Sequence, residues 1–277
     1  DGLLAIQEKS SSAGAPMHMH LLETAFQKEY AFKRTGTTAV KHLEKLGLLG
    51  PHMTLGHGVW MTKEDIEICA GTGTCVCHNC SSNFRLRSGV LPLMELQKRG
   101  MTVGMGMDEA GINDDRDMLQ EMRMALTVHR VPGMTITDVP SPAQVLRMAT
   151  EHGALTTANG AEIGRLEPGR QMDVVVLDYD SATYPFQDPD IAPLDALIHR
   201  AKTKDVQSVM IAGRVVYEDG EFNLIDRAAI LAQIAEALAK PRDAEEQERH
   251  WLREQVFPLV EDFYDGYLQN TSQRTPF

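Results

Sequence analysis

Three short apolar runs in this chain each end on a residue that can bind a metal, and this pattern constrains the fold more than any other feature. The final residues of the runs are His20, His57 and Asp108. In a barrel of alternating strands and helices, the carboxyl ends of the strands converge on one face, so ligands far apart in the sequence meet in space. Two imidazoles and a carboxylate placed in this way predict a hydrolytic metal site. The runs are PMHMH at residues 16–20, MTLGH at 53–57 and MTVGMGMD at 101–108.

A fourth run at residues 74–78 fits the same register, and a helix-like segment follows each of the four. The strands are apolar rather than alternating, as parallel strands covered on both faces should be. Residues 1–158 therefore predict four strand–helix units, with strands that end at His20, His57, His78 and Asp108. The predicted helices cover residues 27–49, 63–71, 89–99 and 114–130.

Four such units make half of an eight-stranded barrel, and half a barrel leaves two sheet edges with unpaired backbone groups. The chain begins with Asp1 rather than Met, and residues 3–9 have the pattern of a helix that leads into the first strand. We therefore expect an α/β fold: a distorted TIM-type (β/α)8 barrel of which these residues supply strands 5 to 8. An N-terminal half would lie outside the 277 residues.

The rest of the chain predicts two further regions. At residues 159–225, after a helix at 144–157, a strand at 173–178 and a hairpin at 206–222 indicate part of a small β-sandwich. Residues 179–193, with three prolines and several aspartates, are typical of a mobile or oligomer-contacting loop.

A C-terminal helical extension covers residues 226–277, with helices predicted at 226–240 and 244–269. The second helix has an apolar side that suits packing or dimerisation, and we expect this side to be buried. Its members are Trp251, Leu252, Val256, Phe257, Leu259 and Val260.

Composition limits the partners. A chain of 277 residues that is 43% hydrophobic can bury a sizeable core. Its formal net charge of −12 argues against nucleic acid and anionic membrane surfaces. No apolar run approaches the roughly 20 residues that cross a bilayer. We therefore expect a cytoplasmic protein with a small-molecule substrate.

All four cysteines lie between Cys69 and Cys80, and the sequence CVCHNC at residues 75–80 superficially resembles a zinc knuckle. Cys75 and Cys77 fall on the same face of a short strand, and no second cysteine pair completes a closed tetrahedral site. We predict buried free thiols in a reducing compartment.

Four motifs in a fixed order resemble the C-terminal part of the amidohydrolase superfamily, in the branch of cytosine deaminase, guanine deaminase and the chlorohydrolases. They are HLLET from His20, LGHG around His57, HNCSSNFRL from His78 and MTVGMGMD up to Asp108. Residues 164–178 and 209–220 resemble the return of that family from barrel to β-sandwich. The resemblance covers residues 16–222 and implies a homodimer.

The resemblance implies one divalent metal per site. His20 would be the ligand from the fifth strand and Asp108 the ligand from the eighth, while the His-x-His pair of the first strand would come from the absent half. Zinc is preferred, although mixed His and Asp ligation also accepts iron, manganese or cobalt.

The implied chemistry is hydrolytic deamination. A divalent ion lowers the pKa of bound water to near 7, so hydroxide is available to attack an aminated ring carbon. Asp108 would take the water proton, Glu23 would protonate a ring nitrogen, and His57 would polarise the attacked centre or hold the hydroxide. Glu23 could instead cap the next helix, although Thr24 could serve equally well.

Four neighbouring residues have supporting roles. We expect His78 and Asn83 to orient a loop by hydrogen bonds, and Glu109 to add an acid beside the metal. Trp60 either walls the substrate pocket against a flat ring or only packs.

Three functions remain in competition. The favoured one is a metal-dependent deaminase of an aminated heterocycle of purine, pterin, pyrimidine or triazine type. The second is a binuclear amidase or dechlorinating hydrolase with His57 on a second metal, against which Glu23 argues. The third is a catalytically incomplete subunit: two ligands do not make a tight hydrolytic zinc site, so we expect the isolated polypeptide to be inactive.

Overall fold

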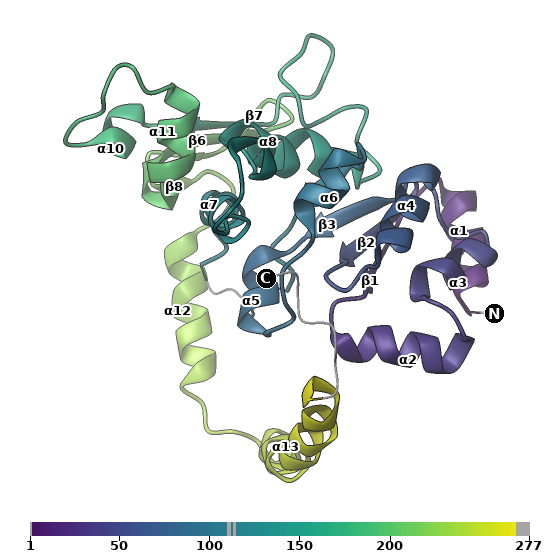
Figure 1. Ribbon diagram of the computed structural model, residues 1–277. Helices are drawn as coiled ribbons and strands as arrows, with labels where there is room; N and C mark the ends of the chain where they lie inside the picture. Colours follow the sequence, from purple (N-terminus) through teal and green to yellow (C-terminus); the bar gives the residue numbers. More distant parts are fainter. Residues whose placement is uncertain (1, 110–111, 113–114, 270–277) are drawn as a thin grey trace.

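The computed structural model describes residues 2–109, 112 and 115–269, which form two four-stranded sheets with helices around them (Figure 1). In the first sheet every strand is parallel to its neighbour, and the spatial order follows the chain order. Leu21 pairs with His57 and His78 pairs with Met105, so the carboxyl ends of the strands lie at one edge. The strands are β1 (Met17–Leu21), β2 (Met53–His57), β3 (Cys75–His78) and β4 (Val103–Met105).

The four predicted strands are confirmed, and their apolar side chains form the core together with the covering helices. Leu55, Val76 and Val103 are fully buried in one hydrophobic cluster. Burial on both faces is what the unbroken apolar runs predicted. The parallel sheet has four strands within the described residues, so the eight-stranded barrel remains a proposal.

The helices depart from the prediction in three places. The helix expected at 27–49 is two helices, because Gly36, with φ of 71°, ends the first and the Thr38 side chain caps the second. An unpredicted short helix follows β3, and the helix expected at 89–99 begins only at Leu93. The predicted start at Asp114 lies outside the described residues. The helices are α1 (Gly2–Ala13), α2 (Ala25–Thr35), α3 (Ala39–Lys45), α4 (Lys63–Thr72), α5 (Cys80–Arg85), α6 (Leu93–Lys98) and α7 (Met118–Val128).

The helix predicted at 144–157 joins the two sheets. Ser141 caps it with Pro142 in the first turn, and a five-residue π-helix interrupts it. Its parts are α8 (Pro142–Arg147), η2 (Met148–His152) and α9 (Gly153–Leu155), and a short 3-10 turn, η1 (Ile136–Asp138), precedes it.

The second sheet is antiparallel and contains the predicted hairpin. Its turn lies at Ala212 and Gly213, both with positive φ, as a tight turn between antiparallel strands requires. The strands, in spatial order, are β5 (Val174–Leu177), β6 (Val206–Ile211), β7 (Arg214–Glu218) and β8 (Glu221–Phe222).

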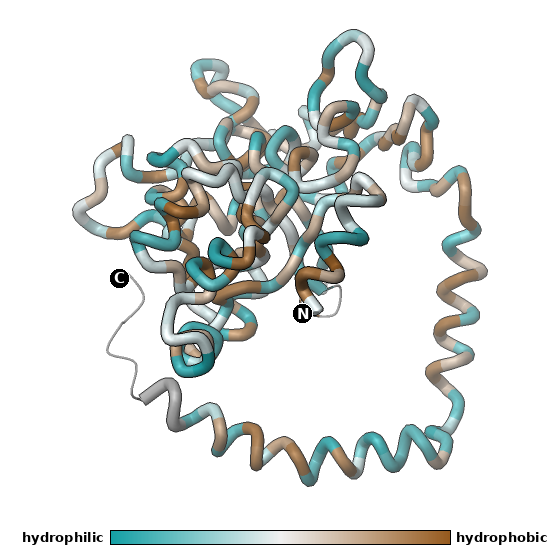
Figure 2. Tube along the Cα trace, turned by 90° about the vertical axis from the view of Figure 1, so that its right-hand side faces the viewer, coloured by the Kyte–Doolittle hydropathy of each residue, from teal (hydrophilic) through white to brown (hydrophobic). Residues whose placement is uncertain are grey.

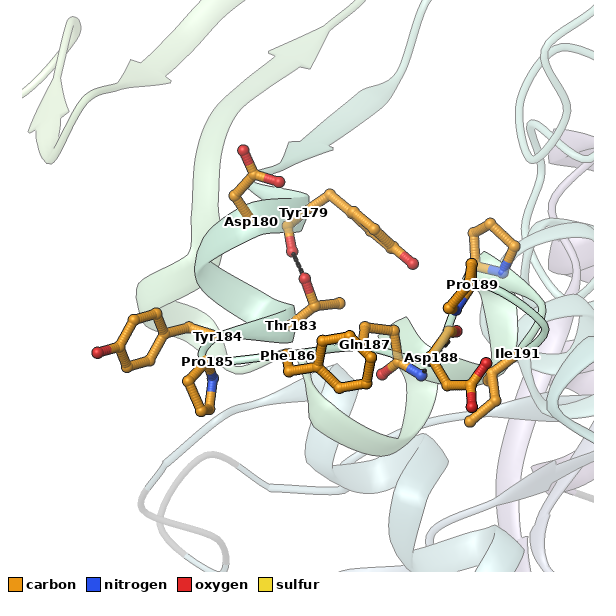
Figure 3. A pocket seen from close by; sticks show the side chains of 11 residues that line it. Tyr179, Asp180, Thr183, Tyr184, Pro185, Phe186, Gln187, Asp188, Pro189 and Ile191 are labelled. Atoms are coloured by element: carbon orange, nitrogen blue, oxygen red, sulfur yellow. Dashed lines mark hydrogen bonds between the residues drawn. The ribbon is translucent and has the colours of Figure 1, made fainter.

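The segment at 179–193, expected as a loop, is partly helical. It contains α10 (Tyr179–Thr183) and leads into α11 (Pro193–Arg200). The Arg200 guanidinium donates hydrogen bonds to the carbonyl oxygens of Thr183, Tyr184 and Phe186, which hold the connection in place. Figure 3 shows the segment lining an open pocket, with the Tyr184 and Phe186 rings at its border. A 3-10 turn, η3 (Thr203–Asp205), follows α11.

The C-terminal helices α12 (Arg227–Leu238) and α13 (Ala244–Gln269) form an arm that stands off from the two sheets (Figures 1 and 2). α13 contacts α2 where the Phe26 ring lies 5.6 Å from Phe263 and 5.5 Å from Tyr264, between ring centroids. The prediction that this side of α13 is buried is wrong within the single chain. The six side chains from Trp251 to Val260 named above are 41–69% exposed, because no other element of the described chain covers them.

The cysteines and the question of a membrane-spanning helix can also be compared with the structure. All four cysteines are buried free thiols, as predicted, and burial raises the pKa of Cys69 and Cys77 to about 12. Among the described residues, no helix combines the length and apolar character that a membrane span requires.

Candidate metal centre

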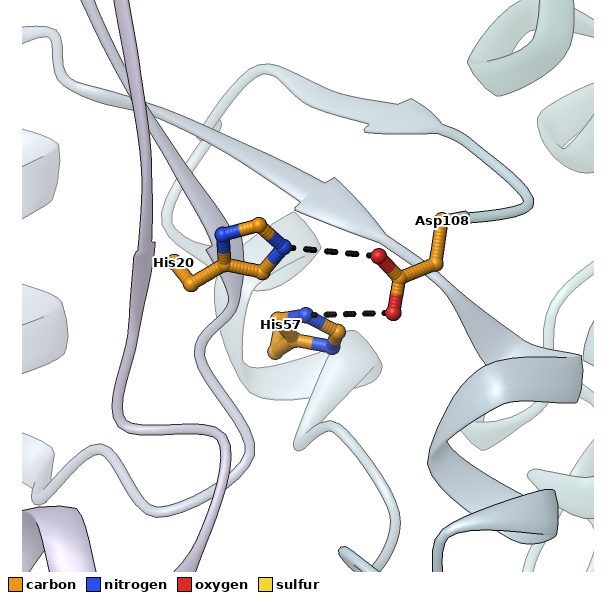
Figure 4. A group of neighbouring side chains, drawn as sticks. All are labelled: His20, His57 and Asp108. Carbon is orange, nitrogen blue, oxygen red and sulfur yellow. Dashed lines mark hydrogen bonds and ion pairs between the residues drawn. The ribbon is translucent and has the colours of Figure 1, made fainter. Parts of the chain in front are cut away.

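Three side chains from the ends of different strands meet at one edge of the parallel sheet (Figure 4). His20 comes from β1, His57 from the end of β2, and Asp108 from the segment after β4. His20 Nε2 lies 3.3 Å from Asp108 Oδ1, and His57 Nε2 lies 3.6 Å from Asp108 Oδ2. One ligand atom from each residue lies within 4.8 Å of the others, which is close enough for a single ion.

The backbone at this edge turns sharply. His57 has φ of 72° and Asp108 has φ of 62°, in the left-handed region that residues with a Cβ rarely adopt. Such a conformation costs about 1–3 kcal/mol per residue and concentrates at functional sites. Here it falls on the last residue of β2 and on the segment after β4, and the two side chains face one another.

The short helix α5 holds both side chains. Ser82 Oγ donates to Asp108 Oδ2 at 2.6 Å, and His57 Nδ1 lies 2.8 Å from Asn83 Oδ1. Since the Asn83 oxygen accepts the Nδ1 proton, the lone pair of the His57 ring is on Nε2. That atom is buried and has no hydrogen-bond partner among the described residues.

The donor set fits a divalent metal. A buried imidazole nitrogen without a partner is costly unless something binds it, and its neighbours are a second imidazole and a carboxylate. Burial alone raises the pKa of Asp108, but hydrogen bonds from Ser82 and His20 and the electrostatic interactions with the two imidazoles outweigh it. The pKa therefore lies below its usual value, and the carboxylate is ionised, as a metal ligand must be.

Glu23 faces the same space. Its Oε2 lies 3.8 Å from His57 Nε2, and its Oε1 accepts a hydrogen bond from Ser88 Oγ at 3.1 Å. Of the two possible caps for α2, Thr24 is the one used: its side chain accepts from the backbone N–H of Gln27. The Glu23 carboxylate is therefore directed toward the cluster rather than used as the helix cap.

The other predicted residues, Trp60, His78 and Glu109, have different surroundings in the structure. Trp60 Nε1 donates to the carbonyl oxygen of Ser88 at 2.9 Å, and Ser88 is also the residue whose hydroxyl donates to Glu23. His78 is fully buried and faces His129 at 3.1 Å between their Nε2 atoms. Glu109 follows Asp108 at an exposed position.

Two residues with contacts at α5 are absent from the sequence-based prediction: Ser82, which donates to Asp108, and Glu121, which accepts from the Ser81 N–H. Ser82 lies beside Asn83 in the HNCSSN motif, but a serine at this position predicts no particular role. Glu121 lies on α7, where Met118, Met122 and Ala125 follow the helical spacing of a core face. A lone carboxylate within that apolar stripe was the available signal.

Comparison with known proteins identifies the family. Residues 1–216 match the amidohydrolase family. The 5-methylthioadenosine/S-adenosylhomocysteine deaminase of Syntrophomonas wolfei is 35% identical over 236 residues, which cover 85% of this chain and 54% of the relative. The 5'-deoxyadenosine deaminase of Methanosarcina barkeri is 33% identical over 237 residues, 85% of this chain and 53% of the relative. This chain thus spans about half the length of the curated relatives it matches.

Solved structures agree. An adenosine deaminase from Xanthomonas campestris with bound zinc superposes with a TM-score of 0.79 and 29% identity, over 84% of this chain and 52% of that one. An atrazine chlorohydrolase from Arthrobacter aurescens in complex with zinc superposes with a TM-score of 0.76 and 26% identity, over 82% and 49%. The resemblance predicted from the ordered strand-end motifs is confirmed, and the chain belongs to the amidohydrolase family.

Proposed function

We propose that this chain carries part of the catalytic site of a metal-dependent hydrolytic deaminase that acts on the adenine ring of an adenosine-type nucleoside. The observation that carries the proposal is the convergence of His20, His57 and Asp108 within 4.8 Å, with Glu23 beside them. The proposal of an adenosine derivative with a modified 5' position is supported by the names of two relatives, a 5-methylthioadenosine/S-adenosylhomocysteine deaminase and a 5'-deoxyadenosine deaminase.

In this proposal His20 and Asp108 hold a zinc ion. Zinc sites that hydrolyse substrates normally have three or more protein ligands, so a His-x-His pair on the first barrel strand would complete the set. The ion supplies Lewis acidity, which makes a nucleophilic water available at neutral pH.

Two side chains then move protons, and a third orients the attacking water. Asp108 accepts a proton from the attacking water, and His57 Nε2, held by Asn83, accepts a hydrogen bond that orients the same oxygen. Glu23 protonates the ring nitrogen next to the attacked carbon. As the ring carbonyl forms, Glu23 recovers a proton from the new hydroxyl group, and the proton on Asp108 passes to the amino group, which leaves as ammonia.

The wider organisation follows the same proposal. Residues 1–158 form the C-terminal half of the barrel, 159–225 belong to a β-sandwich, and 226–277 form the helical extension. The remaining proposals are a homodimer, a cytoplasmic location, and Trp60 and Glu109 at the margin of the substrate pocket.

The test uses the longest natural polypeptide that contains these 277 residues, in wild-type form and as His20→Ala and His57→Ala variants. Zinc content and ammonia release from 5'-deoxyadenosine are measured, with exposed His199→Ala as the matched control. We expect H20A to lose both zinc and activity. H57A should keep its zinc, while kcat falls by about 100-fold or more.

Two outcomes would overturn the proposal. If H20A keeps both zinc and full activity, the ligand assignment is wrong. If the zinc-loaded wild type releases chloride from atrazine but no ammonia from adenosine derivatives, the dechlorinating alternative replaces deamination. The 277-residue polypeptide alone should be inactive in both assays.

A further inference from the structure

The helix α5 (Cys80–Arg85) is too short to be stable alone, yet it holds both Asp108 and His57 through Ser82 and Asn83. Isolated helices shorter than about 12 residues are marginal in water. The N-cap residue of α5, Asn79, makes no side-chain capping hydrogen bond. Something outside the helix must therefore hold its amino end.

Glu121 on α7 supplies that contact. Its side chain is fully buried, and its Oε1 accepts a hydrogen bond from the backbone N–H of Ser81 at 2.9 Å. The accepting oxygen lies at the amino end of α5, where the first backbone N–H groups have no partner within the helix. Glu121 is 40 residues from Ser81 in the sequence, so α7 replaces the local cap.

α7 contacts the same turn a second time. Its C-cap residue His129 faces His78, the last residue of β3, at 3.1 Å between Nε2 atoms. The turn that joins β3 to α5 is thus held at His78 by one end of α7 and at Ser81 by the other.

We infer that Glu121 is a positioning residue for the metal centre: it fixes the amino end of α5, and α5 fixes Asp108 and His57. Glu121 contacts Ser81, and Ser81 belongs to the same helical turn as Ser82 and Asn83, which contact the two site residues. Only the consequence for metal binding rests on the proposed function, because the capping contact stands without it.

The test compares Glu121→Ala and Glu121→Gln with Met122→Ala in the longest natural polypeptide. Met122 is the buried neighbour of Glu121 on the same helix and belongs to the hydrophobic core, so its truncation tests general loss of packing. Two quantities are measured in each protein: the hydrogen exchange of the amides at residues 80–85, and the zinc dissociation constant by chelator competition.

We expect E121A to speed amide exchange in α5 by at least about tenfold relative to β2 and β3, and to weaken zinc binding about tenfold. E121Q should recover much of both losses, because its amide oxygen still accepts from the Ser81 N–H. M122A should lower stability without a selective change in α5 or in zinc affinity.

The inference is wrong if E121A leaves the α5 amides as protected as in the wild type, or alters zinc affinity no more than M122A does. If E121A does not fold, Glu121→Leu replaces it, because leucine fills the buried space but offers no acceptor to the Ser81 N–H. A wild type that binds no zinc would contradict the proposed function, and the exchange of the α5 amides would then decide the role of Glu121 by itself.

Discussion

His78 and His129 are in contact, and their burial determines how both imidazoles titrate. Their Nε2 atoms lie 3.1 Å apart, so one ring must donate and the other must accept. Burial lowers the pKa of His129 to about 4. Burial and the neighbouring imidazoles His129 and His57 hold the pKa of His78 well below its usual value. Both rings are therefore neutral in the folded protein near pH 7.

This contact predicts a loss of stability in mild acid. In the unfolded chain a histidine has a pKa near 6.5, so between pH 6.5 and 4 the unfolded state binds more protons than the folded state. The stabilisation is complete above pH 6.5 and is lost as the pH falls through that window. For His129 the loss is about 3 kcal/mol, from a pKa difference of 6.5 to about 4.

Urea unfolding at pH 7.5 and pH 4.5 measures this effect, with His129→Gln as the comparison. Glutamine preserves a hydrogen-bonding group but does not titrate, so the variant should lose about 2 kcal/mol less stability between the two pH values than the wild type. Equal losses in the two proteins would show that His129 is already protonated when folded.

Among the helices, α3 and α4 are joined at their amino ends by one buried carboxylate. Thr62 and Asp65 form a reciprocal capping box at the start of α4. Asp65 is 1% exposed and also accepts a hydrogen bond from Thr38 Oγ1, the cap of α3. The two caps therefore depend on each other, and both helices cover the parallel sheet.

Replacing Thr62 with alanine should lower the free energy of unfolding by about 1 kcal/mol, because the backbone N–H of Asp65 loses its acceptor. Thr62→Ser should restore most of the loss. Thermal or urea unfolding measures the change, and Thr127→Ala, at an exposed position in α7, is the matched control. If T62A and T127A are equally stable, the capping box does not contribute.

For the whole molecule, the α12–α13 arm exposes apolar side chains that a single chain leaves uncovered. Leu252, Val256 and Leu259 are spaced to form one stripe along α13, and each is at least 45% exposed. The proposed homodimer would bury this stripe.

Charges placed in the stripe should therefore prevent association. We expect the wild type to sediment as a dimer and the Val256→Glu, Leu259→Glu double variant to sediment as a monomer with unchanged circular dichroism. Gln247→Glu, on another side of α13, adds charge without entering the stripe. A wild type that is monomeric at micromolar concentration, or a double variant that still dimerises, would refute this role of α13.

The sequence alone was sufficient for the four parallel strands and for the strand-end residues His20, His57 and Asp108 that the structure brings together, because strand periodicity and strand-end position are local properties. Glu23 was predicted only through the resemblance of the HLLET motif to the amidohydrolases. The break at Gly36 within the first predicted helix was equally local, and it was missed. The amphipathic pattern of α13 predicted an apolar face but not whether this chain would cover it.

Only the tertiary structure decided how the site is held. The hydrogen bond from Ser82 to Asp108 joins residues 26 positions apart, and the capping of α5 by Glu121 joins residues 40 positions apart. The positive φ values of His57 and Asp108 depend on contacts of this kind. These contacts exist because α7 packs beside α5 at the edge of the sheet. No local pattern encodes that packing, since each residue obtains its partner only when the helices come together on the strands.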